Sequence, residues 1–364
     1  MNLQQLGEFG LIEHLRARLP VNVACHSGVL QSIGDDAAVL ASLSTPVITC
    51  DSLIEGVHFR RDWTSPFLLG RKAMAVNLSD LAASGAQPVA AFICLGVSTQ
   101  LAQEDGALAW LEALYDGFQF SANEFGFTLA GGDTVSTSHE IMISITLIGE
   151  VKPENRQFGA PLSRSGAREG NEIFVTGTLG DSAAGLFLLQ HPAVEIGASS
   201  RQYLLERHFN PTPRLCEMRA ALACAEMANR STPVTAALDL SDGLSGDAFH
   251  IASRSGLQLE IETANLPISS ACIEAAQAAQ KMEAAQKSEF DISALGWALS
   301  GGEDYELLLC LAPETSAAVA RAIERETGTR ATRIGVCRQS CAPGVLLLDA
   351  DSQATIASRA WTHF

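Results

Sequence analysis

The segment "PVTAALDLSDGLSGD", residues 233–247, gives the clearest indication of the fold. Its first part is apolar, which predicts a buried strand, and three aspartates follow: Asp239, Asp242 and Asp247. Carboxylates at the end of a buried strand are costly unless a cation or hydrogen-bond donors meet them. The segment therefore predicts a buried strand ending in an acidic turn, and it raises the question of which cation the protein binds there.

Five further segments combine small residues with acids. They are "GDDAA" (Asp35, Asp36), "TCDS" (Asp51), "NLSDLAASG" (Asp80), "AGGDT" (Asp133) and "SGGEDYE" (Glu303, Asp304). Each acid by itself is typical of a turn or a helix N-cap. Together they indicate a shared ligand, because loops at one end of a layered sheet converge in space. We therefore expect the acids to lie in loops around a ligand site.

Magnesium is the cation that fits this pattern. Neighbouring carboxylates repel or raise one another's pKa, and Mg²⁺ is usually held by a few carboxylates together with substrate phosphates. Zinc is disfavoured because the eight histidines are dispersed and no His/Cys pair has ligand spacing. The strand–turn–helix segment "VTGTLGDSAAGL" (175–186) could bind a phosphate at its helix N-terminus. Neither a P-loop nor a dinucleotide-binding motif occurs.

Composition narrows the class of protein. The 364 residues predict two domains. A net charge of −17 argues against binding a nucleic-acid backbone, and no apolar run reaches the length of a membrane span. The N-terminus has no basic n-region, so we expect no signal peptide. The nine cysteines are scattered singly, which is typical of reduced thiols in the cytoplasm.

Strand and helix patterns alternate along the whole chain, which predicts an α/β or α+β layer fold. We expect strands over 27–40, 45–54, 88–97, 127–135 and 139–151, with helices over 66–85 and 101–125. The polar stretch 152–171 marks a boundary, so the expected domains are 1–151 and 152–364. The second domain repeats the alternation, and its Ala/Gln-rich stretch 272–288 is expected to be an exposed helix.

The order of the motifs is specific. The blocks are "GEFGLI", "GDDAAVL", "CDSLIEGVHF", "KAMAVNLSDLAASGAQP", "LAGGDT", "LSRSGAREGN", "VTGTLGDSAAG", "LDLSDGLSGD", "SGGEDYELL" and "WTHF". From residue 7 to the last residue the chain resembles the thiamine-monophosphate kinase family. That family is related to the ATP-dependent synthetases of aminoimidazole ribonucleotide and selenophosphate. The resemblance implies a two-domain synthetase-like fold, a homodimer through βαβ-type N-terminal domains, and ATP bound with several Mg²⁺ ions.

The resemblance also implies roles for single residues. The implied metal ligands are Asp36, Thr49, Cys50, Asp51, Asp80, Asp133, Asp239 and Asp242. The implied ATP contacts are Tyr115, Gly132, Asp133, Arg164 and Ser241, and the implied contacts to thiamine monophosphate are His58, Glu303 and Trp361. Three of these positions have alternatives. Cys50 replaces the Ser or Thr often seen there and could bind through its side chain or its carbonyl, Tyr115 could be a core residue, and Arg164 could be a solvated linker residue.

The implied reaction converts ATP and thiamine monophosphate into ADP and thiamine diphosphate, the final step of thiamine diphosphate biosynthesis. The acceptor phosphate has a second pKa near ~6, so no general base is needed. A selenophosphate synthetase would need a reactive cysteine in a mobile Gly-rich N-terminal segment, a setting that Cys25 lacks. A hydrogenase-maturation relative would end in cysteine, whereas this chain ends in Phe364. A module that only binds Mg-ATP would have little need of every acidic ligand.

Overall fold

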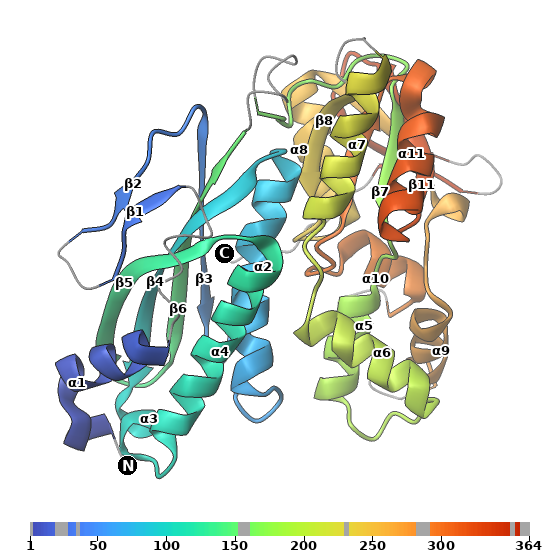
Figure 1. Ribbon diagram of the computed structural model, residues 1–364. Coiled ribbons are helices and arrows are strands. Elements are labelled where there is room, and N and C mark those ends of the chain that lie inside the picture. The colour runs from blue at the N-terminus through green and yellow to red at the C-terminus, as the bar shows by residue number, and fades with distance from the viewer. Residues whose placement is uncertain are drawn as a thin grey trace. The chain divides into compact units, whose positions relative to one another are not determined.

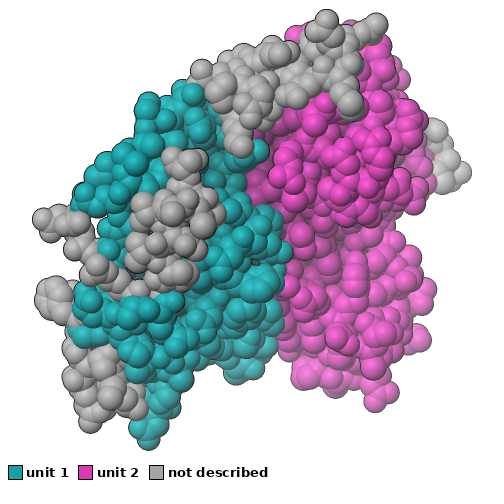
Figure 2. All heavy atoms as spheres, in the orientation of Figure 1, with its two compact units in different colours: residues 1–81, 86–153 teal, residues 82–85, 154–364 magenta. Residues whose placement is uncertain are grey.

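The computed structural model describes residues 3–18, 28–33, 37–151, 161–228, 233–281, 292–349 and 354–356. The chain divides into two compact units, which Figure 2 colours separately. Unit 1 consists of residues 1–81 and 86–153, and unit 2 consists of residues 82–85 and 154–364. None of the helices within the described ranges combines the length and the apolar character needed to cross a membrane.

Unit 1 is built on a four-stranded sheet in the order β3-β6-β4-β5 (Figure 1). Its described elements are α1 (Leu3–Arg18), β1 (Val29–Gln31), β2 (Val39–Leu40), β3 (Pro46–Ile54), α2 (Pro66–Ala83), β4 (Gln87–Ser98), α3 (Thr99–Gln103), α4 (Ala107–Phe125), β5 (Thr128–Thr137) and β6 (Met142–Glu150). Strands β4 and β5 are parallel and the other pairs are antiparallel. The connection from β4 through α4 to β5 is therefore the βαβ unit that the resemblance implied.

Helices α2 and α4 pack against one face of this sheet (Figure 1). Alternate residues of β6, such as Ile143, Ile145 and Leu147, are buried under the helices, because side chains in a strand alternate between the two faces. The two helices approach closely at Gly70 and Gly117. A Cβ atom on Gly117 would lie 2.2 Å from the carbonyl oxygen of Phe67.

Unit 2 contains a seven-stranded sheet in the order β13-β12-β9-β11-β7-β10-β8. Its strands are β7 (Glu172–Thr176), β8 (Val234–Asp239), β9 (Leu257–Glu262), β10 (Leu307–Leu311), β11 (Ala331–Gln339), β12 (Gly344–Leu348) and β13 (Ala354–Ile356). Its helices are α5 (Asp181–Gln190), α6 (Ala198–Phe209), α7 (Leu215–Ala228), α8 (Leu244–Ser255), the 3-10 turn η2 (Thr263–Asn265), α9 (Ser270–Ala279), α10 (Ala294–Ser300) and α11 (Pro313–Thr327).

Both faces of the unit 2 sheet are covered. Leu307 and Leu309 belong to the cluster that contains residues of α7 and α11, and Leu308 belongs to the cluster that contains residues of α8. This two-sided burial explains why β10 is a continuous apolar run instead of an alternating one. Helices α5, α6, α9 and α10 form a separate cluster beyond one end of the sheet (Figure 1).

The mixed α/β fold is confirmed, with three local differences from the expected elements. The expected helix over 101–125 is two helices, because Gly106 adopts a φ of 95° and separates α3 from α4. The expected strand over 27–40 consists of β1 and β2, with residues 34–36 between them lying outside the described residues. The expected exposed helix over 272–288 corresponds to α9, which ends at Ala279. Its exposure is wrong for this part, because Cys272, Ala275 and Ala279 are buried in a hydrophobic cluster with α5, α6 and α10.

Candidate functional site

Three of the implied metal ligands of unit 1 lie where β3 faces α2. The Thr49 hydroxyl donates a hydrogen bond to Oδ2 of Asp80, and the backbone N–H of Asp51 donates to Oδ1 of Asn77 over 3.2 Å. Asn77 is completely buried and its Nδ2 donates to the Ala73 carbonyl. The buried asparagine therefore fixes the strand to the helix, and it brings Thr49, Asp51 and Asp80 to the same side of the sheet.

The expectation that the acids lie in loops is wrong for Asp51, Asp80 and Asp133. They lie inside β3, α2 and β5, which correspond to the elements expected over 45–54, 66–85 and 127–135. The physical reason is that small and β-branched neighbours, read as loop composition in the sequence, also pack closely between strands and a helix.

Cys50 and Asp133 lie on the other face of the unit 1 sheet. In the strand register, Asp133 is opposite Cys94, which is opposite Ser144 and then Ser52. Cys50 is exposed, and its sulfur accepts a hydrogen bond from the Thr146 hydroxyl. Because side chains alternate along a strand, the Cys50 side chain points away from the side that Thr49 and Asp51 share.

Three other implied contacts in unit 1 have well-defined surroundings. The His58 Nδ1 accepts a hydrogen bond from the Ile54 N–H, so its ring proton is on Nε2. The Tyr115 ring makes an edge contact with Phe118, and burial raises the pKa of its hydroxyl to about 12. Gly132 has a φ of 149°, and a Cβ atom there would lie 1.8 Å from the Ile93 carbonyl oxygen. Only glycine fits this close approach of β5 to β4.

Two acidic segments of unit 2, "LDLSDG" and "SGGEDYE", are joined by backbone hydrogen bonds. The Glu303 N–H donates to the Ser241 carbonyl over 2.7 Å, and the Tyr305 N–H donates to the Leu240 carbonyl over 2.8 Å. Asp239 is the last residue of β8 and is 6% exposed. The two segments extend the β8–β10 pairing, and this extension brings the turn with Ser241 and Asp242 beside Glu303.

The turn after β8 is also held from α8. Asp247 lies in the first turn of α8, and its Oδ2 accepts a hydrogen bond of 3.0 Å from the Asp242 N–H. Burial raises the pKa of Asp247 to about 7, although this hydrogen bond and the charge of Arg164 oppose the shift. Arg164 is exposed, and its carbonyl accepts a hydrogen bond from the Ser255 hydroxyl. The structure thus places the Arg164 charge near the turn that contains Ser241 and Asp242.

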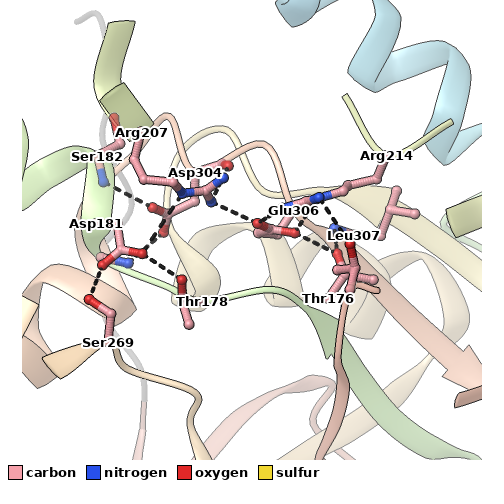
Figure 3. Close-up of polar contacts among 12 residues, drawn as sticks. Thr176, Thr178, Asp181, Ser182, Arg207, Arg214, Ser269, Asp304, Glu306 and Leu307 are labelled. Carbon is pink, nitrogen blue, oxygen red and sulfur yellow. Dashed lines mark hydrogen bonds and ion pairs between the residues drawn. The ribbon is translucent and has the colours of Figure 1, made fainter. Parts of the chain in front are cut away.

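The N-terminus of α5 is occupied by a side chain of the protein itself. Asp304 is 4% exposed and accepts hydrogen bonds from the Gly180 N–H over 2.7 Å and the Ser182 N–H over 3.3 Å (Figure 3). Burial raises the pKa of Asp304 to about 8, and the two N–H groups act against that shift. The expected phosphate site at 175–186 is therefore wrong, because an internal carboxylate takes the position of the anion.

A buried charge network lies beside Asp304. Glu306 is fully buried and accepts hydrogen bonds from Arg207 over 2.7 Å and from Arg214 over 2.5 and 2.7 Å (Figure 3). The Thr176 hydroxyl donates to the same carboxylate. This network and its neighbour His208 were not predicted from the sequence. The segment "RHFNPTPR" (207–214) contains three basic residues, but nothing local to it indicates that they are buried beside Glu306.

A magnesium ion needs oxygen ligands with positions left open for water and phosphate. Within the described ranges, no group of three or more His, Cys, Asp or Glu side chains is arranged to hold a metal by itself. Open sets of oxygen donors such as Thr49 with Asp80 do occur. They fit Mg²⁺, which usually keeps several waters and is held by one or two carboxylates together with substrate phosphates.

The implied site residues are divided between the two units. Unit 1 contains Thr49, Cys50, Asp51, His58, Asp80, Tyr115, Gly132 and Asp133, and unit 2 contains Arg164, Asp239, Ser241, Asp242 and Glu303. Asp36 and Trp361 lie outside the described residues. Their roles and those of the other site residues stay predictions.

Both units match models of one protein family. Residues 34–151 match the AIR synthase related protein N-terminal domain, and residues 168–345 match the AIR synthase related protein C-terminal domain.

Individual relatives extend this match over most of the chain. A thiamine-monophosphate kinase of Escherichia coli (strain K12) is 39% identical over 303 residues, which cover 83% of this chain and 81% of the relative. The crystal structure of thiamine-monophosphate kinase from Stenotrophomonas maltophilia K279a is 34% identical, with a TM-score of 0.74, and covers 98% of this chain and 99% of that one. The structure "AaThiL complexed with AMPPCP and TMP" is 30% identical, with a TM-score of 0.67, and covers 100% and 99%.

Proposed function

Because the chain belongs to the thiamine-monophosphate kinase family, we propose that it transfers the γ-phosphoryl group of ATP to thiamine monophosphate, with thiamine diphosphate and ADP as products. This reaction is the final step of thiamine diphosphate biosynthesis. The proposal rests mainly on the structure of the relative complexed with AMPPCP and TMP, because this chain is similar to that relative over its whole length.

The acceptor is its own nucleophile in this reaction. A phosphate oxygen of thiamine monophosphate is largely ionised at neutral pH, since its second pKa is about 6. The protein therefore has to orient two polyanions for in-line attack and has no proton to remove. Arg164 and the Ser241 turn would bind the nucleotide phosphates, with Tyr115 and Gly132 as further contacts. Glu303 would face the positively charged thiazolium ring, with His58 and Trp361 as further acceptor contacts.

We assign magnesium to the oxygen donors of both units. Asp51 and Asp80 would bind metal together with the Thr49 oxygen atoms, and Cys50 would contribute its carbonyl, because its side chain points to the other face. The remaining proposed ligands are Asp36, Asp133, Asp239 and Asp242, and of these Asp133 lies on the sheet face opposite to Thr49 and Asp51. When bound, the ions neutralise the β- and γ-phosphates and lower the repulsion between the two substrates.

A homodimer is part of the proposal. Among the described residues, the sheet face of unit 1 opposite α2 and α4 exposes Ile48 by 65% and Val135 by 46%, and Cys50 and Cys94 are exposed on the same face. Exposed apolar side chains on one sheet face are typical of an interface, and two-fold pairing is the most common way to bury such a face. Light scattering in solution should give twice the chain mass, and Ile48→Lys should shift it towards one chain.

We further propose a cytoplasmic location. The eight cysteines that the structure describes are all free, which is typical of a reducing compartment.

One assay tests the proposed reaction directly. Purified protein is incubated with ATP, Mg²⁺ and thiamine monophosphate, and the products are identified by mass. We expect thiamine diphosphate and ADP in equal amounts. Turnover of free thiamine or selenide in place of thiamine monophosphate would overturn the proposal.

A further inference from the structure

The segment that presents Glu303 has an unusual backbone. Glu303 and Tyr305 adopt φ values of 67° and 51°, and they are the non-glycine residues with positive φ in the described part of the chain. Such conformations cost free energy and persist where the surroundings fix them, often at functional sites. Here the hydrogen bonds from Glu303 to Ser241 and from Tyr305 to Leu240 fix the segment. The fold therefore stabilises one main-chain conformation at Glu303 despite its cost.

The Glu303 side chain is met by a histidine from α6. Its Oε2 lies 3.5 Å from Nδ1 of His208, and the side chains are 24% and 5% exposed, respectively. One carboxylate oxygen thus faces a buried imidazole, while part of the side chain stays accessible to solvent. The distance is long for a hydrogen bond, and contacts of this kind often shorten when a substrate binds.

The position of the imidazole is set by the packing of α5 against α6. His208 Nδ1 also lies 3.0 Å from the hydroxyl of Ser182, which is buried in the first turn of α5. Gly185 allows the two helices to approach, because a Cβ atom there would lie 2.4 Å from the Leu204 carbonyl oxygen and 3.1 Å from the His208 Cβ. The position of the His208 ring is therefore set by α6 and by Ser182, independently of its contact with Glu303.

These three side chains do not form a nucleophilic triad. In a Ser-His-acid triad the serine and the acid contact different ring nitrogens, whereas Ser182 and Glu303 both approach Nδ1. Ser182 is also only 1% exposed, so no substrate reaches its hydroxyl. The arrangement is suited to orienting a carboxylate.

We propose that His208 is a positioning residue for the acceptor substrate, which fixes the Glu303 carboxylate in the orientation that meets the cationic ring of thiamine monophosphate. The inference rests on the proposed function, since it takes Glu303 as an acceptor contact. A glutamate side chain loses rotamer freedom when it binds a ligand, and a partner that orients it beforehand lowers this cost. The proposed function assigns Glu303 to the acceptor and other residues to ATP, so the effect of His208 should be confined to the acceptor.

The test compares variants of the full-length protein in steady-state kinetics with both substrates. His208→Leu should raise KM for thiamine monophosphate by about tenfold, as expected for a lost hydrogen-bonding partner of a charged group. KM for ATP and kcat should stay within about twofold, and His208→Asn should restore most of the affinity, because its amide nitrogen lies near the position of Nδ1. His191→Leu is the matched control, since His191 belongs to the same helical cluster, where its ring stacks on Phe187 and its Nδ1 lies 3.0 Å from the Phe187 carbonyl oxygen. It should leave both KM values unchanged.

A double-mutant cycle separates positioning from general stability. If His208 acts through Glu303, the variant with both His208→Leu and Glu303→Gln should have the same KM for thiamine monophosphate as Glu303→Gln alone. Additive effects, or equal changes in KM for both substrates, would overturn the role of His208 while wild-type turnover still supported the proposed function. Wild-type protein that forms no thiamine diphosphate would instead overturn the proposed function itself.

Discussion

Asp242 follows β8 in the turn that its own N–H fixes to Asp247. Asn is nearly isosteric and keeps that backbone bond, but it removes one negative charge from the proposed metal site. Asp242→Asn should therefore leave the melting temperature unchanged, or raise it slightly by relieving repulsion between carboxylates. We expect kcat to fall by about a hundredfold or more, since charge stabilisation is usually the largest catalytic effect.

A melting curve and one activity assay on this variant distinguish the two roles of Asp242. If the residue only stabilises the turn, its replacement should cost about 1 kcal/mol, as for a lost helix cap, and kcat should stay near the wild-type value. Partial recovery of kcat at high Mg²⁺ is expected only if the carboxylate binds metal.

Glu306 provides a pH-dependent prediction at the same scale. Burial raises its pKa, but the charges and hydrogen bonds of Arg214 and Arg207 outweigh burial and hold the pKa below its ordinary value of 4.5. A carboxyl group whose pKa is lowered in the folded state stabilises the fold above its unfolded pKa, and it loses that contribution as the pH falls through its folded pKa. Glu306→Gln should cost about 3 kcal/mol or more at pH 7, because two arginines lose their buried partner.

The difference in stability between the wild-type protein and Glu306→Gln should shrink as the pH falls below 4.5. Urea unfolding at pH 7 and at several acidic values measures it. A difference that stays constant across this range would show that the carboxylate is not ionised in the folded protein.

At the scale of elements, the crossing of α2 and α4 depends on a pair of glycines. In Gly117→Ala the new methyl group would meet the Phe67 carbonyl oxygen at 2.2 Å, and a backbone atom cannot move aside as a side-chain tip can. The better helix propensity of alanine is worth only about 1 kcal/mol, whereas overpacking costs about 1–3 kcal/mol. We expect a net loss of stability and a lower kcat, because α2 contains Asp80.

Thermal unfolding measures the first effect and the kinase assay the second. Gly344→Ala is the matched control, because an added Cβ at Gly344 has nothing within 4 Å. A Gly117→Ala variant as stable as this control would mean that the two helices separate without cost.

At the scale of the whole molecule, removal of metal should separate activity from folding. The acids of both units belong to strands, helices and turns whose backbone hydrogen bonds come from the protein itself. Exhaustive chelation should therefore abolish activity and leave the far-UV circular dichroism spectrum unchanged, and Mg²⁺ should restore activity where Zn²⁺ does not. The melting temperature should rise when Mg²⁺ and ATP are added, since ligands that bind only the folded state stabilise it. Full activity after chelation would exclude the proposed magnesium site.

The fold class, the family and the reaction were predictable from the amino-acid sequence. These properties depend on patterns that are local along the chain. The continuous apolar run of β10 indicates that both faces of its sheet are buried. The acidic motifs can be recognised by their residue types and their order along the chain, without knowledge of how the segments pack. A helix such as α2 was predictable for the same reason, since Pro66 at its start and Gly85 after its end are local signals.

Which side chains contact one another was not predictable from the sequence, because it depends on how distant segments pack. Thr49 and Cys50 are neighbours in the sequence but lie on opposite faces of a sheet, because the position of a strand between its partners and a covering helix decides which face is buried. His208 and Glu303 come together only through the packing of α5 against α6 and through the hydrogen bonds of the β8 turn. Asp304 occupies the N-terminus of α5 for the same reason. Such contacts join segments far apart in the chain, so their energy depends on packing and not on local residue patterns.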